Sequence, residues 1–474
     1  MRVLMLGWEF PPHLSGGLGT ACLGLTRALA GMSTEITFVL PTEASDEQAA
    51  HLRLLGAAPA PTGGGGTVAS AAPPPAGGKA PVSASPAPGV TMHAVPSGIT
   101  TPYPDGGEPL RTPDGLQAWL NNPDHAPLPT APASGAGAAP ASPVGARNPY
   151  AGDLLAEAHA YADRCVAMAK DLDFDVVHAH DWPTFPAAAA VSAATGKPWI
   201  AHVHSLESDR AGGVYEVNPQ IDAIERGGVR GADAVIAVSR RTGDRILETC
   251  SIPPSRVTVI YNGIDLFDAG VADVVAGPGT TAPTPPALPQ TRSDDEKIVL
   301  FLGRITAQKG PGYFLDAAQR VLEKYDRVRF VIAGTGDQSH ELVARAGELG
   351  ISDHVLFTGF LGAEDVDRVF RIADLYVMPS VSEPFGIAPL EAIQHDVPVI
   401  ISRQSGVSEV LEHVLKVDFW DTDDLASKML AVLRNPPLAQ TLRENAGQEL
   451  RRLNWRDAAE QCQSVYRSLV GAKA

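Results

Sequence analysis

The sequence predicts an α/β protein in which two Rossmann-like domains face each other across a central cleft. The chain has 474 residues, which is longer than most domains with a single hydrophobic core, so two domains are expected. Short runs of Val, Ile and Leu alternate with amphipathic stretches, as in parallel sheets that helices cover on both faces. A Pro- and Thr-rich tract at 276–296 separates two regions of this kind. Ligands of open α/β sheets bind beyond the carboxyl ends of the strands, so the cleft is the expected site of function.

Buried strands are predicted on both sides of this tract. The runs before it are "RVLMLGWEF", "STEITFVLP", "FDVVHAHDW", "PWIAHVHS", "ADAVIAVS" and "RVTVIYNGI". The runs after it are "KIVLFLGRI", "VRFVIAGTG", "HVLFTGFL", "ADLYVMPS" and "VPVIISR". Amphipathic patterns at 23–30 and 312–325 predict helices that cover the two sheets.

Composition divides the chain into parts. We assign 1–275 to a first domain, 276–296 to a linker, 297–445 to a second domain and 446–474 to a C-terminal helix. Two segments of the first domain, about 57–89 and 129–148, are dominated by Ala, Pro, Gly, Ser and Thr. Such segments cannot bury enough apolar surface to offset the entropy lost on ordering, so disordered insertions are predicted there.

The charge balance excludes several classes of protein. Lys and Arg number 37 against 54 for Asp and Glu, and the net charge of −17 argues against a nucleic-acid surface. The four cysteines lie far apart, without the spacing of a disulfide framework or a zinc site. No integral membrane span is predicted, and the opening "MRVLMLG" stops short of a signal-peptide core. We therefore expect an acidic cytoplasmic protein whose oligomeric state the sequence does not fix.

A glycine-rich stretch, "HLSGGLGTACLGL", follows the first predicted strand. Gly16 and Gly17 stand at the start of an amphipathic helix, where bare glycines let backbone N–H groups approach an anion. The spacing differs from that of the dinucleotide fingerprint, so a tight turn is as consistent with it as a phosphate cradle.

Histidines mark the ends of two strands in the first domain. In "VVHAHDW", His178 and His180 lie on the same side of a strand and precede Asp181. Two such histidines suit a metal, but no third ligand is near them in the sequence, which favours a structural strand end. In "AHVHSLE", His202 and His204 repeat the arrangement. A cleft role and a hydrogen-bonded core histidine are both open for this pair.

Two cations follow the first strand of the second domain. In "FLGRITAQKGPGYF", Arg304 comes just after the strand and Lys309 just before a helix. Cations that converge on a helix N-terminus can hold a pyrophosphate and neutralise its charge as it departs. A solvated turn is the alternative, since Lys and Arg are usually exposed.

Two carboxylates lie in "SVSEPFGIAPLEAI". Glu383 is expected in a loop after a buried strand and Glu391 on a helix that starts near 387–389. Their different settings argue against a glycosidase pair, in which both carboxyls flank one bond. The helix carboxylate suits sugar or ribose hydroxyls, whereas the loop carboxylate suits the reacting hexose.

Together these motifs resemble a known family. The set "SGGLG", "HAHDW", "HSLE", "YNGID", "GRITAQKG" and "SEPFGIAPLEA", in that order, resembles the retaining nucleotide-sugar glycosyltransferases of the GT-B fold, glycosyltransferase family 4. It is similar to glycogen and starch synthases and to sucrose and sucrose-phosphate synthases. The chain departs from glycogen and starch synthases where they carry a Lys in "KxGGL", because Leu14 and Ser15 precede the glycines here. A contact to the donor phosphate is therefore missing or supplied by another residue.

The resemblance implies that the second domain binds the nucleotide sugar, and it implies a role for each of its motif residues. Glu383 contacts the transferred sugar near the reacting carbon, and Glu391 holds the ribose. Arg304 and Lys309 bind the diphosphate and stabilise the leaving group. Backbone amides also contribute to binding the sugar and phosphate; they belong to Phe385, Gly386 and Ile387.

The resemblance makes the first domain the acceptor side of the cleft. It implies that Gly16 and Gly17 give backbone donors to the phosphates or sugar and that His204 lies close to the transferred hexose. Asn262 and Asp181 line the cleft. The C-terminal helix is expected to cross back to the first domain, with packing on its own domain as the alternative.

The implied reaction is metal-independent, retaining transfer of a hexose, with glucose as the first expectation. The donor is a nucleoside-diphosphate sugar, ADP- or UDP-glucose first, and no cofactor is expected. An α-glucan is the first expectation for the acceptor, and a small sugar, as in sucrose-phosphate synthase, the second. Three alternatives stay open: a retaining phosphorylase of the same fold, a sugar-nucleotide epimerase, and a non-enzymatic scaffold that binds sugar nucleotide or glucan.

Overall fold

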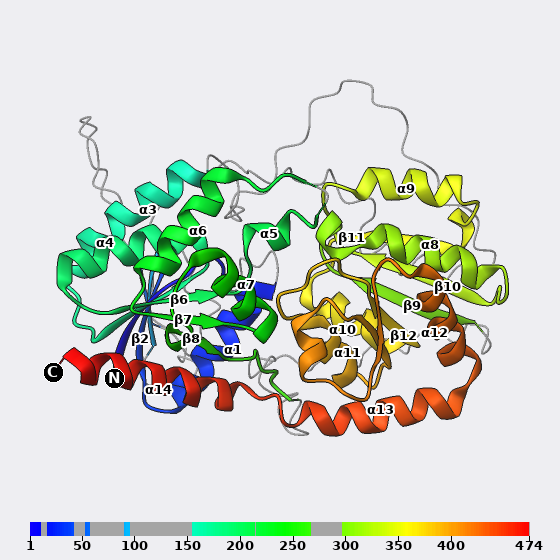
Figure 1. Cartoon of the computed structure of the whole chain (residues 1–474). Helices are drawn as coiled ribbons and strands as arrows, with labels where there is room; N and C mark the ends of the chain where they lie inside the picture. The colour runs from blue at the N-terminus through cyan, green and yellow to red at the C-terminus, as the bar shows by residue number, and fades with distance from the viewer. Residues whose placement is uncertain are drawn as a thin grey trace, which may run out of the picture.

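The structure is a computed structural model. It describes residues 1–10, 17–41, 53–56, 90–94, 154–213, 215–266 and 296–473. The predicted insertions, all but the last residue of the predicted linker, and Gly16 lie outside these ranges. The described chain forms two α/β lobes side by side, and both termini lie at the first lobe (Figure 1). The two predicted Rossmann-like domains are confirmed.

The first domain is built on a parallel sheet of eight strands among the described residues. Its strands are β1 (Arg2–Leu6), β2 (Glu35–Leu40), β3 (Arg53–Gly56), β4 (Val90–Ala94), β5 (Val176–His180), β6 (Trp199–Val203), β7 (Ala234–Ala237) and β8 (Val257–Val259). The order across the sheet is β3-β4-β2-β1-β5-β6-β7-β8. Every residue of β5 and β6 is buried, as expected of strands that helices cover on both faces.

The second domain has a parallel sheet of six described strands. They are β9 (Lys297–Leu302), β10 (Val328–Ala333), β11 (Val355–Gly359), β12 (Leu375–Met378), β13 (Val399–Ser402) and β14 (Leu415–Val417), in the order β11-β10-β9-β12-β13-β14. Each of the predicted runs in both domains contains a strand. β3, β4 and β14 were not predicted.

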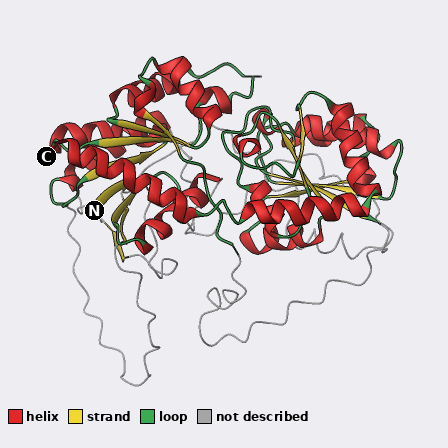
Figure 2. Cartoon of the chain, turned by 60° about the horizontal axis from the view of Figure 1, so that its bottom comes forward, coloured by secondary structure: helices red, strands yellow, loops and turns green. Residues whose placement is uncertain are grey.

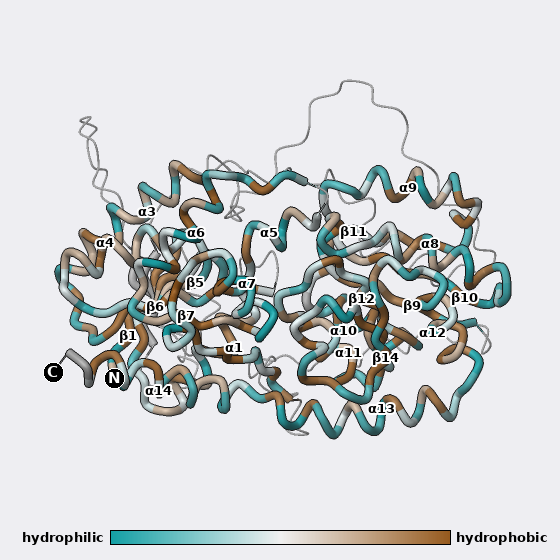
Figure 3. The backbone as a smooth tube through the Cα atoms, viewed as in Figure 1, coloured by the Kyte–Doolittle hydropathy of each residue, from teal (hydrophilic) through white to brown (hydrophobic). Residues whose placement is uncertain are grey.

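Helices cover both faces of each sheet (Figure 2). Those of the first domain are α1 (Gly17–Gly31), α3 (Leu154–Ala169), α4 (Phe185–Thr195), α5 (Glu207–Arg210), α6 (Pro219–Gly231) and α7 (Arg240–Cys250). The remaining helices are α8 (Pro311–Leu322), α9 (Ser339–Glu348), α10 (Ala363–Ile372), α11 (Ala388–Gln394), α12 (Thr422–Arg434), α13 (Pro436–Leu450) and α14 (Trp455–Lys473). The strands are largely hydrophobic, whereas outer helices such as α13 alternate between hydrophilic and hydrophobic residues along their length (Figure 3).

Two hydrophobic clusters pack against each sheet. In the first domain, α3, α4 and α6 supply the cluster on one face, and α1 with α14 supplies the other. In the second domain, α8, α9 and α12 cover one face, whereas α10, α11 and the end of α13 cover the other. Parallel strands bring their carboxyl ends to one edge of each sheet, and the loops at these edges meet between the domains.

The C-terminal segment joins the two domains. The predicted helix over 446–474 is two helices, because α13 ends at Leu450 and α14 begins at Trp455. α14 lies along the first domain, where Trp455 and Tyr466 are buried beside α1 and the first sheet (Figure 1). At the crossing, Gly263 lies so close to the chain that an added Cβ would stand 2.4 Å from the backbone of Asn454, so a larger residue would force the segments apart.

None of the described helices combines the length and apolarity that a membrane span requires. The four cysteines are buried and carry free thiols.

Candidate active site

The loop after β9 brings a lysine to a buried carboxylate. A short 3-10 helix, Ala307–Lys309, ends at Gly310, whose φ of 67° is left-handed. A Cβ on Gly310 would stand 2.2 Å from the carbonyl oxygen of Pro379, so glycine lets this loop lie against the end of β12. Lys309 Nζ then lies 2.5 Å from Oε2 of Glu383, which is only 6% exposed. The two predicted residues therefore form an ion pair across two strand ends.

Gln308, which the motifs did not single out, fixes this loop. Its side chain is buried, and Nε2 donates to the carbonyl of Ser382 at 3.0 Å. Its own carbonyl accepts from Val381 N at 2.9 Å. Arg304 Nη2 donates to Gln308 Oε1 at 3.4 Å, which places Arg304 on the same side as Lys309. The side-chain amide of Gln308 thus contacts Ser382 and Arg304, and its backbone carbonyl holds Val381, so Gln308 fixes the loop that carries both cations.

The second acidic residue of the motif lies on a helix, as the sequence predicts. Glu391 is in the first turn of α11, and burial raises the pKa of its carboxyl. Burial also raises the pKa of Tyr376, and the charges of Glu383 and Glu391 add to that rise, so both carboxylates lie near one buried phenol. They share surroundings, although one is on the loop and the other on the helix.

Backbone groups at the start of α11 complete this side of the cleft. Phe385 is buried, and its carbonyl accepts from Val407 N at 2.7 Å, which fixes the loop before the helix. Gly386 has a φ of 102° and Ile387 is the N-cap. Pro389 has no N–H, and Leu390 and Glu391 donate to the carbonyl of Ile387 at 2.8 and 3.1 Å, so any backbone donor for a ligand at this turn belongs to residues 385–388.

In the first domain, Asp181 positions the chain segment that carries His204. Asp181 Oδ1 accepts from the backbone N–H of His204 at 2.6 Å and of Ser205 at 3.2 Å. Its φ of 59° is costly for a residue with a Cβ, and such strain gathers at functional sites. Burial raises the pKa of its carboxyl to about 7, although Arg210 and the two N–H groups lower it. Because Asp181 is 6% exposed and engaged with backbone, the structure places it as a positioning residue.

His204 belongs to a stack of four imidazoles. His180 Nδ1 lies 2.9 Å from His204 Nε2, and the rings of His202 and His204 stack at 4.1 Å. His178 joins His202 at 3.0 Å and the hydroxyl of Tyr466, on α14, at 2.7 Å. Burial lowers the pKa of all four, to about 3 for His178 and His204. The imidazoles are therefore neutral, and His204 can exchange hydrogen bonds with a sugar hydroxyl without carrying charge.

Three of these histidines also form the group among the described residues that could hold a metal ion. Ring nitrogens of His178, His180 and His202 lie within 4.8 Å of one another. Both nitrogens of His178 already have hydrogen-bond partners, whereas Nε2 of His180 and of His202 has none among the described atoms. A metal would have to replace hydrogen bonds of His178, so the arrangement fits a hydrogen-bonded stack better than a preformed site.

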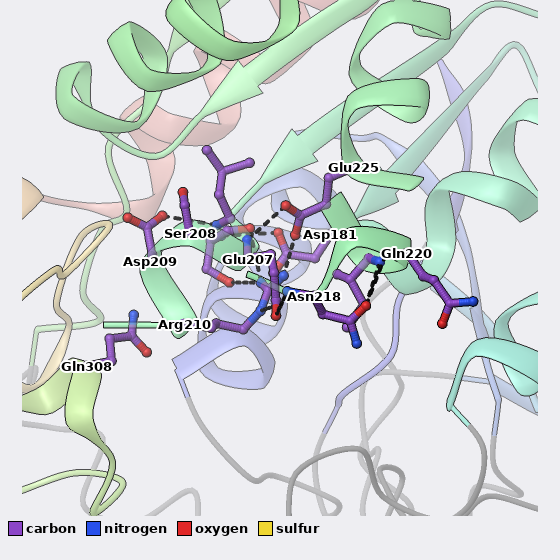
Figure 4. A network of polar contacts seen from close by, with 12 residues as sticks. Asp181, Glu207, Ser208, Asp209, Arg210, Asn218, Gln220, Glu225 and Gln308 are labelled. Carbon is purple, nitrogen blue, oxygen red and sulfur yellow. Dashed lines mark hydrogen bonds and ion pairs between the residues drawn. The ribbon is translucent and has the colours of Figure 1, made fainter. Parts of the chain in front are cut away.

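A buried ion-pair network supports the segment after His204 (Figure 4). Arg210 donates to Glu207 at 3.0 Å and to the hydroxyl of Ser205 at 2.7 Å, and it also pairs with Glu225. Glu225 accepts in addition from the backbone N–H of Glu207 at 2.8 Å. Charges this deeply buried are kept only when they are paired, so the network fixes the loop between β6 and α6.

A hydrogen bond between Ser382 and Asp209 links the two groups described above, and it is one of several that join the domains. Ser382 Oγ donates to Asp209 Oδ1 at 2.6 Å, and Asp209 also accepts from Arg245 at 3.1 Å. Ser382 is next to Glu383, and Asp209 belongs to the segment that Arg210 holds. The group Asp181–His204 and the group Lys309–Glu383 thus meet through this contact.

The other predicted residues stand apart from these contacts. Gly17 opens α1, and Asn262 is buried in the segment after β8. Gly16 lies outside the described residues. Several contributors were not predicted, among them Gln308, Asp209, Ser382 and Arg210. Gln308 lies within the quoted "GRITAQKG", so a polar uncharged residue between two motif cations is the signal that could have identified it.

We expect the protein to lose stability steeply as the pH falls below about 6.5. Histidines of the unfolded chain take up protons near pH 6.5, whereas the four stacked imidazoles of the folded protein stay neutral, down to about pH 3 for His178 and His204. Their stabilisation is therefore complete above pH 6.5 and is lost as the pH falls toward 3. Each such histidine contributes about 1.4 kcal/mol per pH unit in this window.

Asp181 acts in the opposite direction, because its raised pKa keeps it protonated in the folded state up to about pH 7. Burial also raises the pKa of Glu225, Glu391 and Asp265, which act in the same direction as Asp181, but their shifts are smaller. The four histidines therefore still leave a net loss of stability toward acid. Urea unfolding at a series of pH values from 8 to 5 measures the slope. A free energy of unfolding that is flat or rises toward pH 5 would contradict the buried neutral stack.

Comparisons with known proteins bear on this arrangement. A family profile described as "Glycosyl transferases group 1" matches residues 288–449, and one described as "Glycosyltransferase Family 4" matches residues 133–267. The alpha-maltose-1-phosphate synthase of Mycolicibacterium smegmatis is 31% identical over 318 residues, which cover 62% of this chain and 79% of that protein.

Solved structures share the fold at low identity. The sucrose-phosphate synthase from Thermosynechococcus elongatus has a TM-score of 0.65 at 16% identity, with 99% of each chain covered. Anabaena HepE in complex with UDP and glucose has a TM-score of 0.63 at 16% identity, covering 99% of this chain and 100% of that one. At such identity the likeness shows the fold alone.

Proposed function

This chain belongs to family 4 of the GT-B glycosyltransferases, and we propose that it transfers a hexose from a nucleoside-diphosphate sugar to an acceptor hydroxyl with retention of configuration. The resemblance that its motifs carry is confirmed, and with it the class of enzyme. The donor, the acceptor and the stereochemistry are the proposal.

One observation supports the proposal above the others: Lys309 pairs with the buried Glu383 at the N-terminus of α8, and Arg304 lies on the same loop. Two cations beside a helix N-terminus suit a diphosphate, since backbone N–H groups and the helix dipole add to their charge. A carboxylate beside them suits the hydroxyls of a sugar attached to that diphosphate. The three side chains can thus hold both halves of a sugar nucleotide.

The same charges would stabilise the transition state. As the bond to the anomeric carbon breaks, negative charge grows on the leaving diphosphate, and Arg304 and Lys309 compensate it. Retention follows if the acceptor hydroxyl approaches from the face that the diphosphate leaves, where the departing phosphate oxygen can take its proton. The side-chain cations supply the charge compensation, so we propose a metal-independent reaction. His204, being neutral, would orient a hexose hydroxyl.

The donor and acceptor are proposed from the relatives. One fold neighbour is described in complex with UDP and glucose, which supports UDP-glucose, with ADP-glucose as the other candidate. A relative named glycogen synthase, from Mycobacterium tuberculosis, supports an α-glucan as the acceptor, and the one named alpha-maltose-1-phosphate synthase supports a small sugar phosphate. An α-glucan is therefore the first acceptor to test, and a small sugar or sugar phosphate the second.

A screen of donors against acceptors tests the proposal. Purified protein is incubated with ADP-, UDP- or GDP-glucose, each with glycogen, maltose or no acceptor, and release of the nucleoside diphosphate is followed. We expect acceptor-dependent release with one donor and an α-linked product by NMR. A β-linked product would contradict retention. Phosphate-dependent cleavage of a disaccharide without nucleotide release would identify a phosphorylase instead.

A further inference from the structure

An open pocket of about 450 Å³ lies between the domains, outside the contacts described above. Helix α7 of the first domain forms one wall, and the turn after β13 in the second domain forms the other. Arg240, Arg241 and Arg245 line the first wall, and Arg403 faces them from the second. A volume of this size is in the range of small-molecule sites.

Helical periodicity explains why α7 presents so many charges on one side. Arg240, Asp244 and Glu248 recur at intervals of four, and Arg241 and Arg245 form the neighbouring row. The helix therefore exposes alternating arginines and carboxylates to the pocket. Arginines donate to phosphate in a planar fork, and carboxylates accept from sugar hydroxyls, so the wall fits a ligand that carries both groups.

The Arg241 side chain makes no ion pair among the described residues, although the more distant charges of Asp209 and Glu409 act to raise its pKa. Its Nε is buried without a hydrogen-bond partner among the described atoms. Burial lowers the pKa of Arg241, and the neighbouring positive charge of Arg245 lowers it further. Arg245 donates to Asp209 at 3.1 Å, and Arg403 lies 3.9 Å from Asp418. A half-buried guanidinium beside a second one is costly without an anion, so an anionic ligand would relieve both burial and repulsion.

The acid closest to the start of α7 is already engaged. Glu409 accepts from the backbone N–H groups of Arg240 and Arg241, each at 2.9 Å, and from the hydroxyl of Tyr261 at 2.9 Å. It caps the helix across the domain boundary and leaves the Arg241 guanidinium to another anion. Asp244 and Glu248 are both exposed, so both are accessible to a ligand that enters from solvent.

The pocket borders the loop that carries Glu383. Ser405 lines the pocket, and its neighbours pair with that loop: Glu383 N donates to the carbonyl of Gln404 at 3.0 Å, and Gly406 N donates to the carbonyl of Glu383 at 2.9 Å. A ligand held there would lie beside the proposed transfer site and would touch both domains. It would therefore stabilise the present arrangement, in which the two domains are in contact.

We propose that this pocket binds a sugar phosphate, with Arg241, Arg245 and Arg403 holding the phosphate and Asp244 and Glu248 accepting from sugar hydroxyls. The ligand is either the acceptor of the transfer reaction or a regulator that stabilises the contact between the two domains. The acceptor case rests on the proposed function, whereas binding itself does not.

Calorimetric binding without any donor tests the pocket. The probes are glucose 1-phosphate, glucose 6-phosphate and inorganic phosphate, added to the wild type and to Arg241→Gln, Arg403→Gln and Arg368→Gln. Arg368 is a matched control, since its side chain is exposed on α10 and pairs with Asp365 outside the pocket. We expect at least one hexose phosphate to bind the wild type and the control alike, and about tenfold or more weaker binding to the two pocket variants.

Two results would overturn the proposal: no probe binds the wild type, or Arg241→Gln and Arg403→Gln bind as tightly as Arg368→Gln. The UDP or ADP affinity of all variants is measured alongside and should stay unchanged, which shows that the domains are intact. Transfer assays with a donor labelled in its hexose then distinguish the two roles of the ligand. Label that appears in the hexose phosphate identifies an acceptor, whereas faster transfer to another acceptor identifies a regulator. Absence of transfer with intact hexose phosphate binding would contradict the proposed function and not the pocket.

Discussion

Replacing Lys309 with methionine is expected to lower the turnover of hexose transfer by about a hundredfold or more, with the fold intact. The ammonium group pairs with Glu383 and lies at the start of α8, where negative charge grows as the diphosphate leaves. Methionine fills a similar volume without the charge, so the loss falls on the chemical step. Initial rates of nucleoside diphosphate release measure the effect, and circular dichroism checks the fold.

Lys428→Met is the matched control for this experiment. Lys428 also pairs with a carboxylate, Asp424, but on α12 outside the cleft, and its loss should leave turnover unchanged. Arg304→Ala should reduce turnover as Lys309→Met does, because both cations are proposed to hold the diphosphate. Wild-type turnover in a folded Lys309→Met or Arg304→Ala protein would contradict the cationic clamp.

Glu383→Gln is expected to have the second large effect, again about a hundredfold in turnover. The carboxylate is 6% exposed, and glutamine keeps its shape while removing its charge. Without that charge, Lys309 stays free for the diphosphate, so the affinity for UDP or ADP should be equal to that of the wild type or higher. The expected signature is a fall in kcat without loss of nucleotide binding.

Glu391→Gln provides the contrast, since Glu391 is proposed to hold the ribose from α11. Glu391→Gln should weaken nucleotide binding. At saturating donor it should keep a higher kcat than Glu383→Gln does. A Glu383→Gln protein that loses nucleotide binding and keeps its kcat would assign Glu383 to the nucleotide and contradict its proposed place beside the hexose.

The sequence predicts most of this fold because long apolar runs mark buried parallel strands. It misses β3, β4 and β14, which have four, five and three residues and too few apolar positions to stand out by periodicity. The sequence analysis also misses the break between α13 and α14, although Asn454, a residue type favoured at helix N-caps, stands just before α14. Asn454 Oδ1 accepts from Asp457 N at 2.9 Å, which is the hydrogen bond of a helix N-cap.

Part of the candidate site could be predicted from the sequence and part could not. Arg304, Lys309 and Glu383 each lie in a short local motif, so their residue types and strand-end positions are visible in the sequence. The contact between Ser382 and Asp209 joins residues 173 positions apart, and that between His178 and Tyr466 joins residues 288 apart. No local pattern encodes such pairs, because domain packing and the return of α14 create them.

The central claim is that Arg304 and Lys309 hold the diphosphate of a sugar nucleotide. Equilibrium titration of UDP and ADP into the wild type and into the Arg304→Ala/Lys309→Ala double variant tests it most directly. The account predicts that the wild type binds at least one of the two and that the double variant binds it about a hundredfold more weakly or worse. A folded double variant that binds the nucleotide as tightly as the wild type would contradict it.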